Sequence, residues 1–235
     1  MHIRPLTRAD LPSIAQISYQ AFKDDELNAY LFPKQHEYPG DLRKFQLLRL
    51  RTRFVTQGMH GWVVVTDEKD GEGMWKGKEE VVGFASLLRL GDDEKAKRWQ
   101  ADSWSNALER QLLRIEGWYD ATFVDRARSP SNMASFIAAA PWNDLAIYKQ
   151  RWHLAILGVS PTHQRRGIGA MLVQHGQRLA ADDGVPLTLE SSLIGRRLYT
   201  KQGFRVVSEK KLAEGMDAVC MMWESQATGE GEKGE

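Results

Sequence analysis

The sequence has little of several features that mark particular classes of protein. It contains one cysteine, Cys220, which excludes an intramolecular disulfide, and the apolar run 218–223 around it predicts a buried structural thiol. No run of about 18 apolar residues exists, which excludes a membrane-spanning helix. We find no cysteine and histidine spacing typical of zinc and no internal repeat, so no metal site is expected.

Charge of one sign is also scarce. The formal net charge of the 235 residues is +1, so nothing indicates binding to nucleic acid or to an acidic partner. The N-terminus lacks a charged segment leading into an apolar stretch, so we expect no secretory signal. A soluble cytoplasmic protein is expected, monomeric or homodimeric, with no nucleic-acid or membrane partner.

Apolar residues are plentiful enough for a core of ordinary size. They make up 42% of the chain, and at this length one domain is expected, over residues 1–223. Residues 224–235 are rich in glycine, glutamate and lysine, which predicts a disordered tail.

The most informative segment joins an apolar strand to an apolar helix through a loop that contains glycine. Residues 154–159 predict the strand, and roughly 167–182 predict the helix, which ends before Gly184 and Pro186. Backbone N–H groups in the first turn of a helix have no helical partner, and the helix dipole adds positive potential there. An anion is therefore expected at the start of this helix.

Two arginines and two glycines precede or begin that helix. Gly167 and Gly169 remove Cβ atoms that would keep a phosphate away from the N–H groups, while Arg165 and Arg166 add permanent charge. With Gln164 they form the pattern Gln-x-x-Gly-x-Gly, which differs from the dinucleotide and nucleoside-triphosphate loops. The segment predicts a cradle for a pyrophosphate.

Three parts of the chain resemble the GNAT acetyltransferase superfamily. The pattern at 164–169 is similar to its acetyl-CoA pyrophosphate loop. One helix and one strand later, Leu-Tyr-x-x-x-Gly-Phe at 198–204 is similar to its second signature. The chain start also fits, with Thr7 and Asp10 as a capping pair before a helix. The order of these parts makes the resemblance more specific than any one of them.

The resemblance implies an α/β (α+β) GNAT fold. Its central sheet is mixed, mostly antiparallel and twisted, splayed between strands 152–159 and 187–190, and flanked by helices. Residues 24–40 are expected to be irregular, and the charged, glycine-rich connection 67–78 to be mobile. The remaining predicted elements are strands 2–5, 61–66, 80–88, 204–208 and 217–223, with a polar loop between the last two, and helices 8–22 and 41–57.

Residues 91–150 depart from the minimal family pattern and predict a helical insertion packed over the sheet. Residues 131–140 form a short apolar helix ended by Pro141. Residues at helical spacing form one stripe at Ala96, Trp99 and Gln100 and another at Leu108, Leu112, Ile115 and Tyr119. Four tryptophans here either fill the core or line an acceptor pocket, namely Trp99, Trp104, Trp118 and Trp142.

The resemblance implies acetyl-CoA as cosubstrate and no metal. Pantetheine would pair with the open edge of strand 152–159, and the pyrophosphate would meet the helix start. Ser191 or Ser192 is expected to cap the second helix, and Ser192 stands where many relatives have a cofactor-contacting asparagine. The implied cofactor-binding residues are Leu157, Val159, Gln164, Arg165, Arg166, Gly167, Gly169, Ala170, Ser192 and Tyr199.

The same resemblance implies roles in catalysis. Tyr199 would donate a proton or a hydrogen bond to the departing thiolate, and otherwise it is a core aromatic on the helix face that bears Gly195. Glu190, at the end of its strand, is the predicted general base. His153 is a rival, and His175 is expected to be a packing or surface residue. A water chain or an acceptor already neutral would need none of them.

Three functions remain open from the sequence. The first is an acetyl-CoA-dependent N-acetyltransferase that acts on a small primary amine by direct attack in a ternary complex. The second is the same chemistry on a lysine or a protein N-terminus, and the third is a non-catalytic CoA-binding module. The acidic runs 24–26 and 92–94 are interpreted as loop and helix-start charge rather than as a polyamine site. The acceptor, and N- versus O-acetylation, stay undetermined.

Overall fold

Seven strands form one mixed, mostly antiparallel sheet, as predicted. The computed structural model describes residues 1–71, 73–139, 141–213 and 216–225. The strand order is β1-β2-β3-β4-β5-β7-β6, and β4 pairs with β5 in parallel while the other neighbours are antiparallel. The strands are β1 (His2–Pro5), β2 (Met59–Val65), β3 (Val81–Leu90), β4 (Arg151–Val159), β5 (Leu187–Ser191), β6 (Arg205–Ala213) and β7 (Met216–Trp223).

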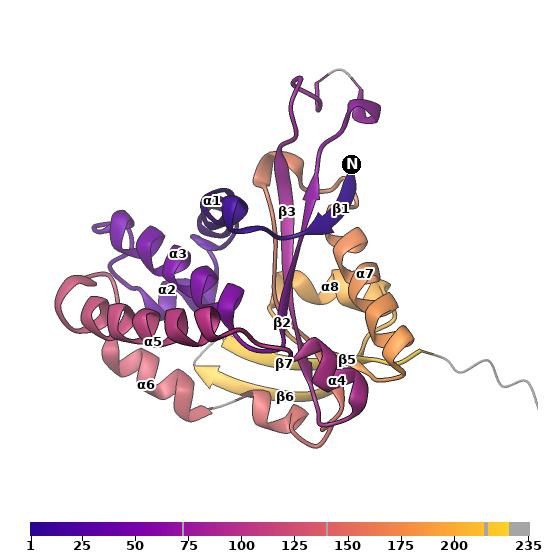
Figure 1. Ribbon diagram of the computed structural model, residues 1–235. Helices are drawn as coiled ribbons and strands as arrows, with labels where there is room; N and C mark the ends of the chain where they lie inside the picture. Colours follow the sequence, from indigo (N-terminus) through magenta and orange to yellow (C-terminus); the bar gives the residue numbers. More distant parts are fainter. Residues whose placement is uncertain (72, 140, 214–215, 226–235) are drawn as a thin grey trace, which may run out of the picture.

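Helices cover both faces of this sheet (Figure 1). In that view α1, α2, α3, α5 and α6 lie on one side of the sheet, and α4, α7 and α8 lie on the other. No helix of the described chain is both long and apolar enough to cross a membrane. The helices are α1 (Leu11–Phe22), α2 (Glu26–Leu31), α3 (Pro39–Val55), α4 (Glu94–Trp99), α5 (Trp104–Tyr119), α6 (Pro130–Ala139), α7 (Ile168–Asp183) and α8 (Leu193–Lys201).

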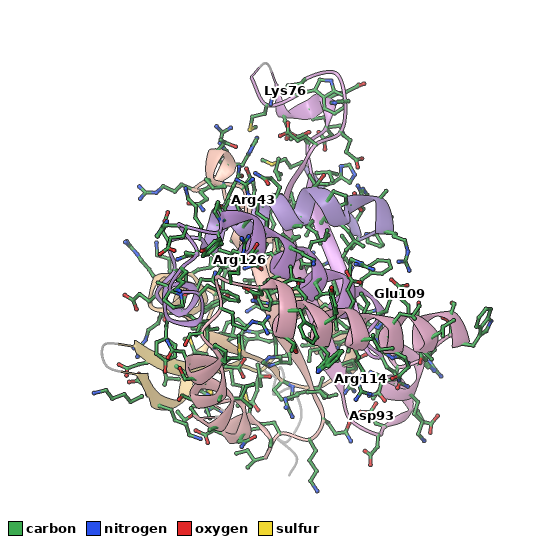
Figure 2. The ribbon with its side chains drawn as sticks, turned by 90° about the vertical axis from the view of Figure 1, so that its left-hand side faces the viewer. Arg43, Lys76, Asp93, Glu109, Arg114 and Arg126 are labelled. Atoms are coloured by element: carbon green, nitrogen blue, oxygen red, sulfur yellow. The ribbon has the colours of Figure 1, made fainter. Side chains whose placement is uncertain are left out.

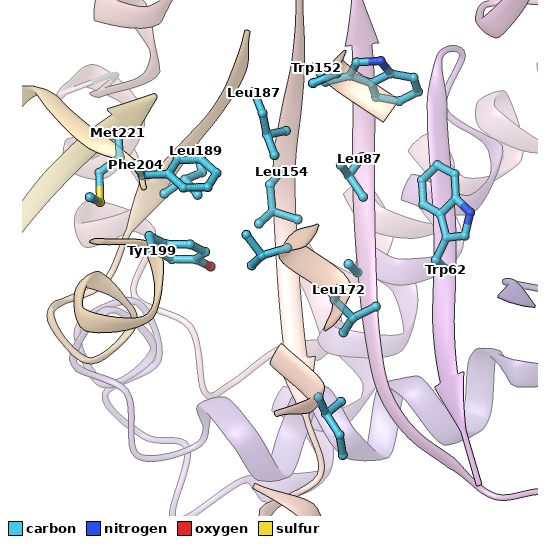
Figure 3. Packing of buried hydrophobic residues seen from close by; sticks show 14 of the residues in the cluster. Trp62, Leu87, Trp152, Leu154, Leu172, Leu187, Leu189, Tyr199, Phe204 and Met221 are labelled. Carbon is cyan, nitrogen blue, oxygen red and sulfur yellow. The ribbon is translucent and has the colours of Figure 1, made fainter. Parts of the chain in front are cut away.

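The core has one apolar layer on each face of the sheet. On the α7 side, Leu154, Leu172 and Leu187 belong to a cluster that also contains Tyr199 and Phe204 (Figure 3). On the other side, residues of α1 and α3 pack on β2, β3 and β4. Alternation along a strand therefore decides which helices each side chain meets.

Several predicted features agree with the structure. Gly184 ends α7 in the left-handed conformation, with φ of 72°, and Ser192 caps α8. Asp93 Oδ1 accepts a hydrogen bond from the Ala96 N–H at 2.7 Å, so this acidic run starts a helix. Cys220 is buried, and burial raises the pKa of its thiol, which confirms a structural role.

Some element boundaries predicted from sequence were wrong. Residues 24–40 are not wholly irregular, because Asp25 accepts a hydrogen bond from the Leu27 N–H at 3.0 Å and starts α2. Helix α3 begins at Pro39 rather than 41, since proline suits the first helical turn. Strand β6 continues to Ala213 where a polar loop was expected, because it pairs with β7. The tail beyond residue 225 lies outside the described residues.

The insertion is helical, but its longest helix is not packed over the sheet. Helix α5 lies on α3, where Leu113 joins Leu48 and Val55 in a small buried cluster. The predicted stripe faces solvent instead, with more than half of each side chain exposed at Leu108, Leu112, Ile115 and Tyr119. The face that packing buries carries Leu113, and the predicted stripe lies on the other face of α5. Sequence periodicity could not choose between them.

Asp10 joins the first strand to the first helix and gives a testable pH dependence. Its carboxylate accepts hydrogen bonds from Arg4 at 2.8 and 2.9 Å and from Thr7, and Arg4 above all lowers the pKa of Asp10 to about 2. A depressed pKa stabilises the fold above the unfolded value of 3.8, and this contribution is lost as pH falls toward 2.

We expect Asp10→Asn to lower the free energy of unfolding at pH 7 by about 2 kcal/mol and to flatten its pH dependence between about 2 and 4. Urea denaturation at a series of pH values measures both effects. Asp24→Asn is the matched control, because the Asp24 side chain is 76% exposed. An Asp10→Asn variant as stable as the parent at pH 7 contradicts the prediction.

Candidate active site

A wedge opens where β4 and β5 separate. The two strands pair from Trp152 to Leu154 on β4 and from Leu187 to Leu189 on β5, and the described pairing goes no further. Opposite this point, the register between β3 and β4 shifts, so that Ala155 is an extra residue on β4. The predicted splay between these strands is present, and the bulge at Ala155 marks its origin.

The bulge changes which β4 side chains face each helix layer. Before it, Trp152 and Leu154 lie in the cluster with α7, whereas after it Leu157 and Val159 do so. Ile156 lies in the other cluster, with α1. Leu157 and Val159 therefore lie on the unpaired part of β4, where the sequence predicted backbone contacts to pantetheine.

The predicted pyrophosphate cradle lies at the start of α7. Gln164, Arg165, Arg166 and Gly167 are all exposed there. Arg165 has φ of 61° and Gly167 has φ of 81°, so the loop turns sharply before the helix begins. A Cβ built on Gly167 would meet nothing within 4 Å, so the space beside this glycine is open. An anion could approach the free N–H groups of the first turn, including that of Ala170.

Gly169 has a different physical role from Gly167. A Cβ at this position would lie 3.1 Å from Leu198 Cδ2 and 3.9 Å from Leu157 and Val159 side chains. Its lack of a side chain therefore permits α7 to approach α8 and β4. Close packing is thus a second reason for glycine at this position, and a phosphate contact at the Gly169 N–H group stays a prediction.

Ser192 is engaged in capping. Its Oγ accepts a hydrogen bond from the Gly195 N–H at 3.2 Å at the start of α8. The hydroxyl stays exposed, so a cofactor contact remains a prediction. Gly195 lies close to Tyr199, because a Cβ there would be 3.1 Å from Tyr199 Cε2.

Tyr199 reaches the wedge from the α8 side. Its ring packs against Phe204 with centroids 5.7 Å apart, and Figure 3 shows its hydroxyl directed toward the strand that carries Leu154. Burial raises the pKa of Tyr199 to about 12. The phenol therefore stays protonated across the neutral range and can donate a hydrogen bond at any assay pH.

Glu190 reaches the wedge from the opposite face. Leu187 and Leu189 lie in the α7 cluster, so alternation places Glu190 on the side of α3. Its Oε2 lies 3.3 Å from His153 Nε2, and its Oε1 is buried without a hydrogen-bond partner among the described residues. His153 Nδ1 is 3.1 Å from the Thr188 hydroxyl. The predicted base and its rival thus form one pair.

His175 is placed as expected, away from this pair. Its ring packs on Trp62 with centroids 4.9 Å apart, and burial lowers its pKa.

Three tryptophans of the insertion lie apart from the candidate site. Trp99 packs on Trp152 with ring centroids 5.1 Å apart in the core, and Trp104 and Trp118 are mostly exposed. Trp142 falls where side chains are not described. None of the other three lines the pocket described next.

Sequence reasoning missed a pocket between α3 and α5. Its volume is about 450 Å³. Arg53 extends from this pocket to the bulge, where its Nη2 donates to the Ala155 carbonyl at 3.4 Å. The signal was present in the spacing of large and basic residues along one face of α3. The lining residues are Phe45, Leu48, Arg49, Thr52, Arg53, Leu113, Gly117 and Arg128.

Among the described residues, no group of three or more His, Cys, Asp or Glu side chains is arranged to bind a metal ion. The groups that meet at the wedge are instead a phenol, a carboxylate with a histidine, and the open edge of a strand. Such a site can orient an acyl group and manage protons.

Comparisons with known proteins agree with the fold. The family model for the acetyltransferase (GNAT) domain matches residues 93–225. A protein described as an acetyltransferase from Stachybotrys chartarum is 24% identical over 220 residues, which cover 92% of this chain and 85% of the relative.

Solved structures share the fold. A Corynebacterium glutamicum protein described as histone acetyltransferase HPA2 and related acetyltransferase has a TM-score of 0.59 at 17% identity, covering 96% of this chain and 97% of that one. A GCN5-related N-acetyltransferase from Rhodopseudomonas palustris has a TM-score of 0.51 at 15% identity, covering 95% and 94%. At these identities the likeness concerns the fold alone.

Proposed function

The chain belongs to the GNAT acetyltransferase family, and from this premise we propose that it transfers an acetyl group from acetyl-CoA to the primary amine of a small molecule. Acetyl-CoA is the typical cosubstrate of GNAT enzymes. The observation that carries the choice of acceptor is the pocket of about 450 Å³ between α3 and α5, because its lining residue Arg53 donates a hydrogen bond to Ala155 at the wedge. That volume lies within the range of small-molecule sites, about 300–1,000 Å³.

The residues present fit acetyl-CoA. The open space beside Gly167 and the exposed Arg165 and Arg166 suit a pyrophosphate at the start of α7. Leu157 and Val159 have unpaired backbone toward β5, which suits an extended pantetheine arm. When bound, acetyl-CoA supplies an activated acyl group as a thioester. Gln164 would support the loop, since its Nε2 donates to the Val159 carbonyl at 3.4 Å.

The proposed step is direct attack in a ternary complex. The amine nitrogen attacks the acetyl carbonyl carbon, a C–N bond forms, and the C–S bond breaks. Glu190, paired with His153, accepts the proton that the amine loses. Tyr199 donates a hydrogen bond or a proton to the sulfur as it leaves, from the other side of the wedge. The amine thus loses its proton on the α3 face of the sheet, and the sulfur receives its hydrogen bond or proton on the α8 face.

Calorimetric titration with acetyl-CoA, together with a free-thiol release assay on a panel of primary amines, tests this function. We expect binding and amine-dependent thiol release. Binding with thiol release only when peptides are supplied would transfer the proposal to a protein acceptor. Binding without release from amines or peptides would support a non-catalytic CoA-binding module, and absence of binding would reject the cofactor site.

Gly167 offers a direct test of the cradle. We expect Gly167→Asp to weaken CoA binding by about 10- to 100-fold, because a carboxylate would lie within a few ångströms of the pyrophosphate. Gly167→Asn is the matched control, since asparagine has the same shape and also tolerates positive φ. Equal CoA affinity of the two variants in calorimetry would show that the phosphates lie elsewhere. Gly169→Asp is a poorer probe because it would also collide with Leu198.

A further inference from the structure

The pocket between α3 and α5 has a strongly cationic wall. Arg49 and Arg53 lie one helical turn apart on α3, and Arg128 lies across from them. Figure 2 faces the side of the molecule on which α3 and α5 lie next to each other. Phe45, Leu48 and Leu113 complete an otherwise apolar lining. Three guanidinium groups therefore line one small, largely open pocket.

Arg49 and Arg53 lack a direct ion pair within the described chain, although the charge of Asp25 favours the charged form of Arg49. Neither Arg49 nor Arg53 forms an ion pair with any described residue, and Arg53 Nη1 is buried without a hydrogen-bond partner there. The nearby carboxylates are used elsewhere. Glu116 pairs with Arg51 at 2.9 Å and Asp125 pairs with Arg128 at 3.1 Å. A buried donor left unpaired is costly, so its retention indicates a ligand.

The electrostatic cost of burying these two charges lowers the pKa of both groups. Burial lowers the pKa of Arg49 to about 10, with Asp25 opposing the shift. Burial, and then the charge of Arg49, lower the pKa of Arg53 to about 9. Arginine keeps its proton at neutral pH, so these directions measure how unfavourable the two charges are without a partner. An anion in the pocket would remove that penalty.

The pocket is on the acceptor side of the wedge. It opens on the α3 face of the sheet, whereas the cradle at Gly167 belongs to α7 on the other face. A phosphate of CoA bound at that cradle would therefore lie away from Arg49. Arg53 ends at Ala155, beside the last paired residues of β4 and β5 and on the face that carries Glu190. A ligand in the pocket would reach the reacting centre from this side.

We propose that Arg49 and Arg53 bind a carboxylate of the acceptor, so that the substrate is a primary amine that also carries a carboxylate group. This rests on the proposed acetyltransferase function and narrows its substrate class. A guanidinium donates paired hydrogen bonds that match the two oxygens of a carboxylate. Phe45, Leu48 and Leu113 would contact the carbon chain between the carboxylate and the amine. The amine would then lie near Ala155 and Glu190.

Matched pairs of amines test this proposal. We suggest phenylalanine with phenethylamine, leucine with 3-methylbutylamine, and 4-aminobutyrate with butylamine, each assayed by thiol release with saturating acetyl-CoA. We expect kcat/KM to be more than about tenfold higher for the carboxylated member of at least one pair. In Arg49→Gln and Arg53→Gln the preference should disappear while CoA affinity in calorimetry stays unchanged.

Arg43→Gln is the matched control. Arg43 is on the same helix but exposed, and its guanidinium lies 4.6 Å from the centre of the Tyr19 ring. This variant should keep the preference of the parent. Arg53→Lys should restore only part of it, because lysine keeps the charge without the planar pair of donors.

A binding assay separates failure of this proposal from failure of the proposed function. We expect butyrate and 3-phenylpropionate, which carry no amine, to raise Tm of the parent protein but not of the Arg49→Gln, Arg53→Gln double variant. If carboxylates bind without acetylation of any amine, the anion pocket stands and the proposed function fails. If amines are acetylated equally with and without a carboxylate, the function stands and this proposal is overturned. Absence of any carboxylate-dependent shift in Tm also overturns it.

Discussion

Replacing Tyr199 with phenylalanine is expected to lower kcat by about 100-fold while leaving the affinity for acetyl-CoA nearly unchanged. The substitution removes one oxygen atom and keeps the ring that packs against Phe204 at 5.7 Å. The fold should therefore survive. A donor that acts on sulfur as the C–S bond breaks stabilises the transition state more than the bound thioester, so its loss appears in kcat.

The pH dependence adds a second readout. Because burial raises the pKa of Tyr199 to about 12, the active, protonated form is populated at every pH below that value. Activity should therefore show no fall due to Tyr199 up to about pH 10, and any rise with pH must come from the amine or its base. Tyr119→Phe is the control, since Tyr119 is 54% exposed on α5. Parental turnover by Tyr199→Phe would remove the phenol from the mechanism.

Replacing Arg89 with methionine is expected to lower the free energy of unfolding by about 3–5 kcal/mol. The Arg89 side chain is fully buried between Asp183 Oδ2 at 2.8 Å and Asp93 Oδ2 at 2.6 Å. Trp152 Nε1 also donates to Asp183 at 2.9 Å. Arg89 thus joins β3, the start of α4 and the end of α7, and its loss leaves Asp183 largely buried without a cation.

Urea denaturation measures this effect, and Arg98→Met on the exposed face of α4 is the control. The double variant Arg89→Met, Asp183→Asn should lose less than the sum of the two single changes, because each removes the partner of the other. Additive losses would show that the pair is not the source of the stability. Sequence analysis did not single out Arg89, since the predicted strand 80–88 ended before it.

The parts of the fold that were predicted correctly depend on local signals. Gly184 ends α7, Ser192 caps α8, and Thr7 with Asp10 starts the first helix, each within four residues. The face that α5 buries could not be predicted in this way. Leu113 is buried and Leu112 is exposed because α3 packs on one face of α5. Contacts between these two helices join residues far apart in sequence, such as Arg51 and Glu116, which are 65 residues apart.

The same difference between local signals and long-range contacts applies to the candidate site. Residues 164–170 and Tyr199 could be predicted as site residues because a short motif specifies a loop or a helix face. The pairing of Glu190 with His153, the bulge at Ala155 and the approach of Arg53 to it each join separate elements. The basic residues of α3 are spaced along one face of the helix, but no spacing rule connects α3 with β4 or α5, so the pocket itself could not be predicted from the sequence. The close approach of Leu198 to Gly169 is likewise a contact between separate helices that the motif does not reveal.

The insertion between β3 and β4 has a consequence for how this fold can change. Its two ends, Leu90 and Arg151, are neighbours in the sheet. Loop closure becomes less favourable by only about 0.6 kcal/mol for each doubling of length, so a connection of this size is destabilising by only a few kcal/mol relative to a tight turn. Leu113 and Arg128 of the pocket lie within it, whereas Glu190 and Tyr199 lie outside. Under the proposed function, redesign of this segment is expected to alter acceptor choice while Glu190 and Tyr199 keep their places.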